Sequence, residues 1–129
     1  MPKHIWKLSV ANDSGGTVLA STSTVEDDSE SNFGPLTVAA GDTIEVDLPI
    51  DVSQVVSFYV YCDKAVTVKT NSNASPSQTF SLLAKEPLAW KTDDLAANPL
   101  TIDVTKWFVH NAGADDGSVK AGFLLDLSA

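Results

Sequence analysis

Residues 55–70 of this chain read VVSFYVYCDKAVTVKT, and this stretch decides the fold class. Over residues 55–63 the side chains alternate, so that four apolar groups share one face: Val56, Phe58, Val60 and Cys62. Residues 65–70 repeat the alternation, with Val66 and Val68 on one face and Thr67 and Lys69 on the other. A period of two is typical of half-buried antiparallel strands. The stretch therefore predicts two strands joined by a tight connection at Asp63-Lys64.

The same alternation recurs on both sides of this stretch. It predicts further strands over residues 3–10, 17–23, 43–48, 78–84, 101–104, 106–110 and 119–127. Residues 12–16, NDSGG, predict a hairpin loop. Only residues 51–54, with Asp51 as a cap, and residues 92–97 tolerate a helical turn. The pattern predicts an all-β chain, a single antiparallel β-sandwich or jelly-roll-like domain over residues 1–129 with about eight to nine short strands.

Two segments depart from this pattern. Residues 24–35, TVEDDSESNFGP, are acidic and polar. We expect them to form a long surface loop, or an arm that orders against a neighbouring subunit. Residues 119–127 are apolar on both faces, which indicates either a central strand or a strand in an oligomer interface.

Composition narrows the possible functions. The chain has 129 residues, 43% hydrophobic and 19% charged, as expected for one folded domain. Its net charge is −9 and it contains no arginine, so we expect neither nucleic acid nor an anionic membrane as a partner. No apolar stretch is long enough for a membrane span. Residues 1–6 lack the apolar core of a secretory signal, which predicts a protein made and used without Sec export.

The residues that carry chemistry are few and scattered. His4 and His110 lack a nucleophile setting, and Cys62 is predicted to be a small buried hydrophobe. The acidic pairs Asp27-Asp28, Asp93-Asp94 and Asp115-Asp116 offer calcium ligands, but their spacing matches no EF-hand, so we interpret them as solvated loop acids. The sequence therefore predicts no catalytic residue, no metal and no cofactor, and a protein that is not an enzyme.

Three stretches carry a family resemblance: residues 50–71, residues 84–90 (AKEPLAW) and residues 100–111 (LTIDVTKWFVHN). Together they resemble small structural proteins of tailed bacteriophages, which share a run of strands and turns with D-x-x-V-T-V-x-T-N-S, P-L-x-W and D-V-T-x-x-x-V-x-N elements. The resemblance covers residues 43–126. It implies a β-sandwich virion component assembled in the host cytoplasm, of the capsid decoration (cement) type. The implied partners are the major capsid protein and further copies of the chain, in a homotrimer.

A decoration protein acts through interfaces, and edge strands and apolar anchors are the features that form them. Residues 3–10 are the first candidate edge, and residues 24–35, with Phe33 as anchor, are the second. The predicted interface residues are Ile5, Trp6, Phe33, Tyr59, Tyr61 and Trp90. Two other functions remain open: a tail, baseplate or head–tail connector component, and a carbohydrate-binding module. The module would use exposed aromatic rings from Trp6, Trp90, Trp107, Tyr59 and Tyr61.

Overall fold

The computed structural model describes the backbone of residues 1–11, 17–27 and 29–129, and the side chains of residues 1–7, 22–27 and 29–129. Within these residues the chain is all-β, with antiparallel sheets and one short 3₁₀ turn. The strands are β1 (Lys3–Ala11), β2 (Thr17–Glu26), β3 (Ser29–Val38), β4 (Thr43–Val46), β5 (Val55–Cys62), β6 (Val66–Thr70), β7 (Thr79–Leu82), β8 (Leu88–Lys91), β9 (Trp107–His110) and β10 (Gly117–Leu125).

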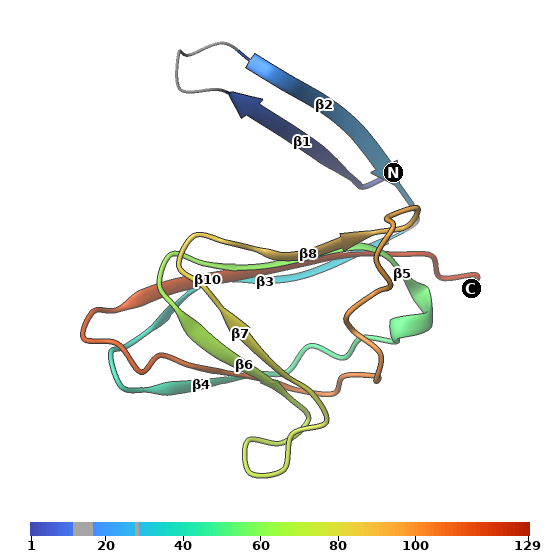
Figure 1. The fold of residues 1–129 in the computed structure, drawn as a ribbon. Helices are drawn as coiled ribbons and strands as arrows, with labels where there is room; N and C mark the ends of the chain where they lie inside the picture. The colour runs from blue at the N-terminus through green and yellow to red at the C-terminus, as the bar shows by residue number, and fades with distance from the viewer. Residues whose placement is uncertain (12–16, 28) are drawn as a thin grey trace.

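Two four-stranded sheets form a sandwich, with strand orders β3-β10-β5-β8 and β4-β9-β6-β7 (Figure 1). The chain crosses between the sheets at β3–β4, β4–β5, β5–β6, β7–β8, β8–β9 and β9–β10. Eight strands in this order form a jelly roll. The predicted β-sandwich is thus confirmed. The connection at Asp63-Lys64 joins strands of different sheets, which alternation alone does not reveal.

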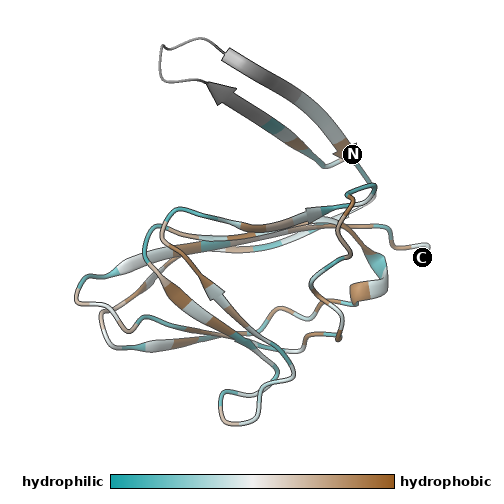
Figure 2. Cartoon of the chain, in the orientation of Figure 1, coloured by the Kyte–Doolittle hydropathy of each residue, from teal (hydrophilic) through white to brown (hydrophobic). Residues whose placement is uncertain are grey.

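The core lies between the two sheets, because the alternation of side chains along each strand directs its apolar face toward the opposite sheet. In Figure 2 hydrophobic and hydrophilic residues follow one another along the strands of both sheets. The rings of Phe58 and Phe123 stack at 5.6 Å, and Trp107 packs against Phe123 at 5.2 Å. All three side chains are completely buried, and the Trp107 indole N–H donates to the Leu48 carbonyl at 3.0 Å. The aromatic groups of both sheets therefore form one shared centre.

Strands β1 and β2 form a separate two-stranded hairpin that extends beyond the sandwich and arches above β8 (Figure 1). Its register pairs Lys3 with Glu26 and Ile5 with Thr24. This confirms the predicted strands at residues 3–10 and 17–23, while the predicted loop at residues 12–16 lies outside the described residues. Because β2 ends at Glu26 and β3 begins at Ser29, the hairpin continues almost directly into the sandwich.

The prediction of a long loop over residues 24–35 is wrong. Residues 24–26 end β2 and residues 29–35 begin β3, which pairs with β10 along its length. Only Phe33 and Val38 of β3 are buried, so backbone pairing rather than an apolar pattern forms this strand. Gly34, with φ +90°, lies beside the register shift in this pairing, and a Cβ there would lie 2.3 Å from the Val119 carbonyl oxygen. A larger residue could not occupy that position.

Several other predictions can be compared with the structure. Strands at residues 43–48, 55–63, 65–70, 78–84, 106–110 and 119–127 are confirmed, with shifts of a few residues at their ends. The turn at residues 51–54 is also confirmed, because Asp51 caps a 3₁₀ turn over Val52–Gln54. The predicted strand at residues 101–104 is wrong: it contributes only an isolated bridge between Val104 and Ile50. The apolar strand at residues 119–127 is central, since β10 lies between β3 and β5.

Polar side chains fix the long connection between β8 and β9. Asn71, with φ 71°, donates to the Asp103 carbonyl at 2.9 Å, and its Oδ1 accepts from the Thr105 amide at 2.7 Å. Gln78 donates to the Pro99 carbonyl at 2.9 Å and accepts from the Thr101 amide at 3.0 Å. Asn71 directly follows β6 and Gln78 directly precedes β7, so these two side chains hold the long connection against that pair of strands.

Candidate functional site

The base of the β1–β2 hairpin is fixed to the sandwich by a polar cluster. Ser57 lies on the outer face of β5 and is completely buried. Its hydroxyl accepts from the Trp6 indole N–H at 3.1 Å and lies 2.6 Å from His4 Nδ1. His4 Nε2 lies 2.9 Å from a Glu30 carboxylate oxygen on β3. The cluster thus joins β1 to the two strands on either side of β10.

The donors and acceptors of this cluster form a consistent chain. An indole N–H can only donate, so the Ser57 hydroxyl accepts from Trp6 and can give its own hydrogen to His4 Nδ1. This direction places the His4 hydrogen on Nε2, where it donates to Glu30. Each polar group of the cluster then has a hydrogen-bond partner, as expected for polar groups that have little access to water.

Tyr59 extends the contact between hairpin and sheet. Its ring lies 5.7 Å from that of His4 and passes so close to Gly122 on β10 that a Cβ there would be 2.7 Å from the ring. Burial, together with the nearby Glu30 charge, raises the pKa of the Tyr59 phenol. A hollow of about 250 Å³ remains beside this ring, between the hairpin and β8; its lining is His4, Ile5, Trp6, Lys7, Tyr59, Pro87 and Ala89.

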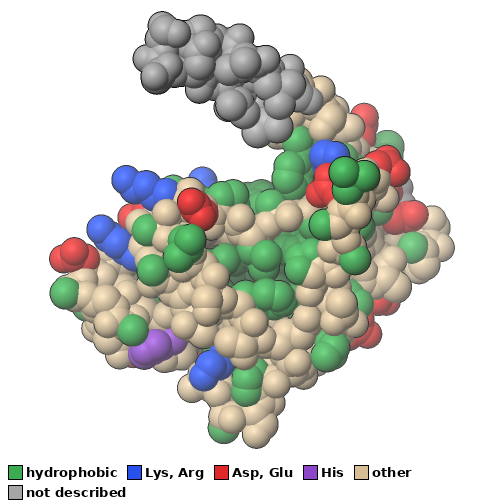
Figure 3. Space-filling model, viewed as in Figure 1, with side chains coloured by type: hydrophobic (Ala, Val, Ile, Leu, Met, Phe, Trp, Pro, Cys, Tyr) green, Lys and Arg blue, Asp and Glu red, His purple; other side chains and the backbone are tan. Residues whose placement is uncertain are grey.

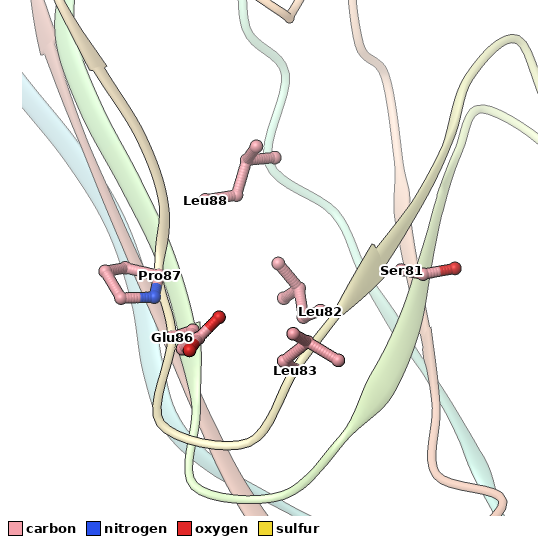
Figure 4. A pocket seen from close by; sticks show the side chains of 6 residues that line it. All are labelled: Ser81, Leu82, Leu83, Glu86, Pro87 and Leu88. Atoms are coloured by element: carbon pink, nitrogen blue, oxygen red, sulfur yellow. The ribbon is translucent and has the colours of Figure 1, made fainter.

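A second candidate surface is the open side of the sandwich. Hydrophobic side chains gather in a hollow on the visible face, over the gap between β8 and β7 (Figure 3). Leu82 of β7 and Leu88 of β8 extend into this gap from the two sheets, with Leu83 and Pro87 nearby (Figure 4). The hollow measures about 180 Å³. Leu82 is buried, whereas Leu83 is 64% exposed. We call this surface the edge groove.

Unpaired strand edges border both surfaces. Each of β7 and β8 pairs with one neighbour, so each has a free edge beside the edge groove. In the part of the hairpin that the structure describes, β1 and β2 pair only with each other. A free edge offers backbone N–H and C=O groups for pairing with another strand. Strand addition, with apolar side chains entering a groove, is therefore the kind of contact these surfaces offer.

The structure brings three of the predicted interface residues together at the hairpin base. Ile5 is 54% exposed, while Trp6 and Tyr59 are half-buried around the hollow beside it. Tyr61 lies further along β5, with the Lys120 ammonium 5.6 Å from its ring centre. Trp90 is half-buried on β8, and its indole N–H donates to the Ala96 carbonyl at 3.1 Å.

The side chains of Phe33 and Trp107 are both buried in the core, so neither is available for contacts at the surface. Phe33 is 7% exposed and packs 6.1 Å from the Trp107 ring, so the prediction of an exposed anchor at Phe33 is wrong. Trp107 is completely buried. The aromatic platform expected of a carbohydrate-binding module therefore cannot include Trp107, and the indole N–H groups of Trp6 and Trp90 are already bonded within the chain.

The scattered chemical groups remain separate. Cys62 is completely buried, and burial raises the pKa of its thiol. His110 lies on the outer face of β9, 2.8 Å from the Thr43 hydroxyl, far along the chain from the His4 cluster. In the described part of the chain no three His, Cys, Asp or Glu side chains gather as metal ligands. Nor does any described helix have the length and apolarity to cross a membrane.

Sequence reasoning missed two features of these surfaces. Ser57 is a small polar residue among larger ones in β5, and its partners His4 and Trp6 lie on β1, 53 and 51 residues away in the sequence. The edge groove depends on which strands end each sheet, which no local pattern states. The acidic character of Glu30 was visible, but its pairing with His4 was not.

Comparison with known protein families, with curated proteins and with solved structures found no match to this chain.

Proposed function

We propose that this chain is a non-enzymatic structural protein of a phage virion, a capsid decoration protein that binds the outer shell and bridges neighbouring capsomers. The observation that carries this proposal is the β1–β2 hairpin, which extends from the jelly roll and, within the described residues, has a free edge on each strand (Figure 1). An arm of this kind can add strands to a neighbour while the sandwich keeps its own core.

The surface chemistry supports the same proposal. The edge groove and the hairpin offer apolar and backbone contacts, which suit a lasting interface. With 17 acidic and 8 basic residues, the chain suits a basic docking partner. In this proposal the partners are the major capsid protein and further copies of the chain in a trimer.

The proposal is tested first by quantitative peptide mass spectrometry on purified particles from the source. A ratio near one copy per copy of the major shell protein supports decoration. A ratio of a few hundredths identifies a tail, baseplate or connector component instead. Complete absence from the particles refutes a virion role.

The role of the hairpin needs a separate test on particles that lack the protein. Ile5→Glu places a charge on the hairpin where the wild-type side chain is 54% exposed, and Leu127→Glu does the same at a position that is 56% exposed near the C-terminus. We expect Ile5→Glu to lose particle binding and Leu127→Glu to keep it. Equal binding of both variants would contradict the hairpin as the docking element.

A further inference from the structure

The outer face of the second sheet carries a row of polar side chains that neither the core nor the hairpin uses. Strand register places Thr43 of β4 opposite His110 of β9, His110 opposite Thr67 of β6, and Thr67 opposite Ser81 of β7. Three hydroxyl groups and one imidazole thus form a line across all four strands, spaced by the distance between neighbouring strands.

Two hollows adjoin this row. One of about 270 Å³ is lined by Thr43, Thr67, Lys69, Asn73 and His110. The other, of about 250 Å³, also has Thr67, Ser81 and His110 in its lining and adds the apolar side chain of Leu83, which is 64% exposed. Because Thr67 and His110 line both hollows, the hollows adjoin at these side chains, and we call the pair the trough; it is polar on the side of β4 and partly apolar toward β7.

The hydrogen-bonding groups of the trough are only partly satisfied within the described chain. His110 uses Nδ1 toward the Thr43 hydroxyl at 2.8 Å. The Lys69 ammonium has a single long contact, 3.4 Å to the Asn73 carbonyl, and it has three donors to offer. The Thr67 and Ser81 hydroxyls have no partner among the described residues.

The charge of the trough differs from that of the whole chain. The chain has 17 acidic and 8 basic residues, yet no carboxylate from the described residues lines either hollow, while Lys69 and His110 both do. A local cationic group among hydroxyl and amide groups fits a ligand that has both a carboxylate and many hydroxyls.

We propose that this trough binds an acidic saccharide, with the carboxylate of a uronic acid unit at Lys69 and its hydroxyls along Thr43, His110 and Thr67. The neighbouring sugar unit lies toward Ser81, over the apolar part of the trough. This binding activity is independent of the hairpin, because it uses the opposite sheet, but its β7 end adjoins the edge groove, which Ser81 and Leu83 also line.

Isothermal titration calorimetry on the full chain tests the proposal, with a galacturonic acid oligomer as probe and a neutral galactose oligomer of equal length for comparison. We expect the acidic oligomer to bind more tightly. Lys69→Gln should weaken it by about tenfold or more, as the loss of one charge-assisted hydrogen bond does. Thr67→Val, which preserves the branched shape, should weaken both oligomers. Lys106→Gln is the matched control, since Lys106 already contacts Glu45 at 3.3 Å and does not line the trough.

Each contrary result overturns a part of the proposal. No binding of the acidic oligomer overturns it entirely. An equal loss of affinity for the acidic oligomer in Lys69→Gln and Lys106→Gln reveals diffuse attraction to positive charge rather than a specific site. Inorganic phosphate that binds as tightly as the oligomer, with Thr67→Val unaffected, reveals a simple anion site and overturns the saccharide.

Discussion

Replacing Ser57 by alanine should loosen the hairpin without unfolding the sandwich. The change removes the acceptor for the Trp6 indole N–H, 3.1 Å away, and the partner of His4 Nδ1, 2.6 Å away. At about 1 kcal/mol for each hydrogen bond, docking of the hairpin loses about 2 kcal/mol. This is about a thirtyfold shift toward the undocked state. Because Trp6 is only half-buried, water can satisfy its released N–H, so the loss should not greatly exceed this value.

Hydrogen exchange with mass spectrometry measures this shift. An isolated two-stranded hairpin is at best marginally stable in water, so undocking should expose the amides of β1 and β2. Peptides covering β1 and β2 should exchange about thirtyfold faster in Ser57→Ala, whereas peptides from β6 and β9 should be unchanged. Ser81→Ala, a serine on the other sheet, is the control. The reasoning is refuted if Ser57→Ala leaves the hairpin as protected as Ser81→Ala does.

Three further predictions concern the sandwich. Gly122→Ala should lower the free energy of unfolding by about 1–3 kcal/mol in urea titrations, because the new Cβ would lie 2.7 Å from the Tyr59 ring; an unchanged midpoint would contradict this close packing. Asn71→Gly should have a lower free energy of unfolding than the wild type, because it loses the side-chain hydrogen bonds of Asn71. Asn71→Ala should be less stable than Asn71→Gly by about 1–2 kcal/mol, because alanine disfavours the φ of 71°; thermal unfolding of the two variants side by side checks this order. The Ser118 amide donates to the Asp63 carboxylate at 2.7 Å and holds the pKa of that carboxyl below its usual value of 3.8. The hydrogen bond therefore stabilises the fold above pH 3.8, and this stabilisation is lost as the pH falls through the lowered pKa. Asp63→Asn should therefore show a smaller loss of stability between pH 5 and about pH 2 in urea titrations; the same acid dependence in both proteins would exclude this linkage.

The strands that the sequence predicts are those whose side chains divide between core and solvent. Residues 55–63 and 65–70 alternate because Phe58, Val60 and Val68 are buried between two sheets. Strand β3 is different, since its residues 29–32 have no apolar side chain and it exists because β10 offers a free edge. A pattern method cannot recognise a strand whose partner, rather than its own side chains, determines it.

The candidate sites depend even more on distant parts of the chain. The aromatic residues of β5 were identified as interface candidates from their type, but the burial of Ser57 depends on β1, more than fifty residues earlier. Phe33 appeared to be an exposed anchor because its neighbours are polar, yet it belongs to the buried face of β3. The polar row from Thr43 to Ser81 becomes visible only once the order of four strands is known.

The short distance between the hairpin and β3 has a mechanical consequence. Tension on the hairpin passes through Glu26 and enters the sandwich at Ser29, the first residue of β3, which pairs with Leu125 at the end of β10. Hydrogen bonds between antiparallel strands lie perpendicular to the strands. A pull along β3 therefore loads its ladder with β10 in shear, all bonds together, instead of peeling them one by one. A pull in this direction is therefore resisted by the whole β3–β10 ladder.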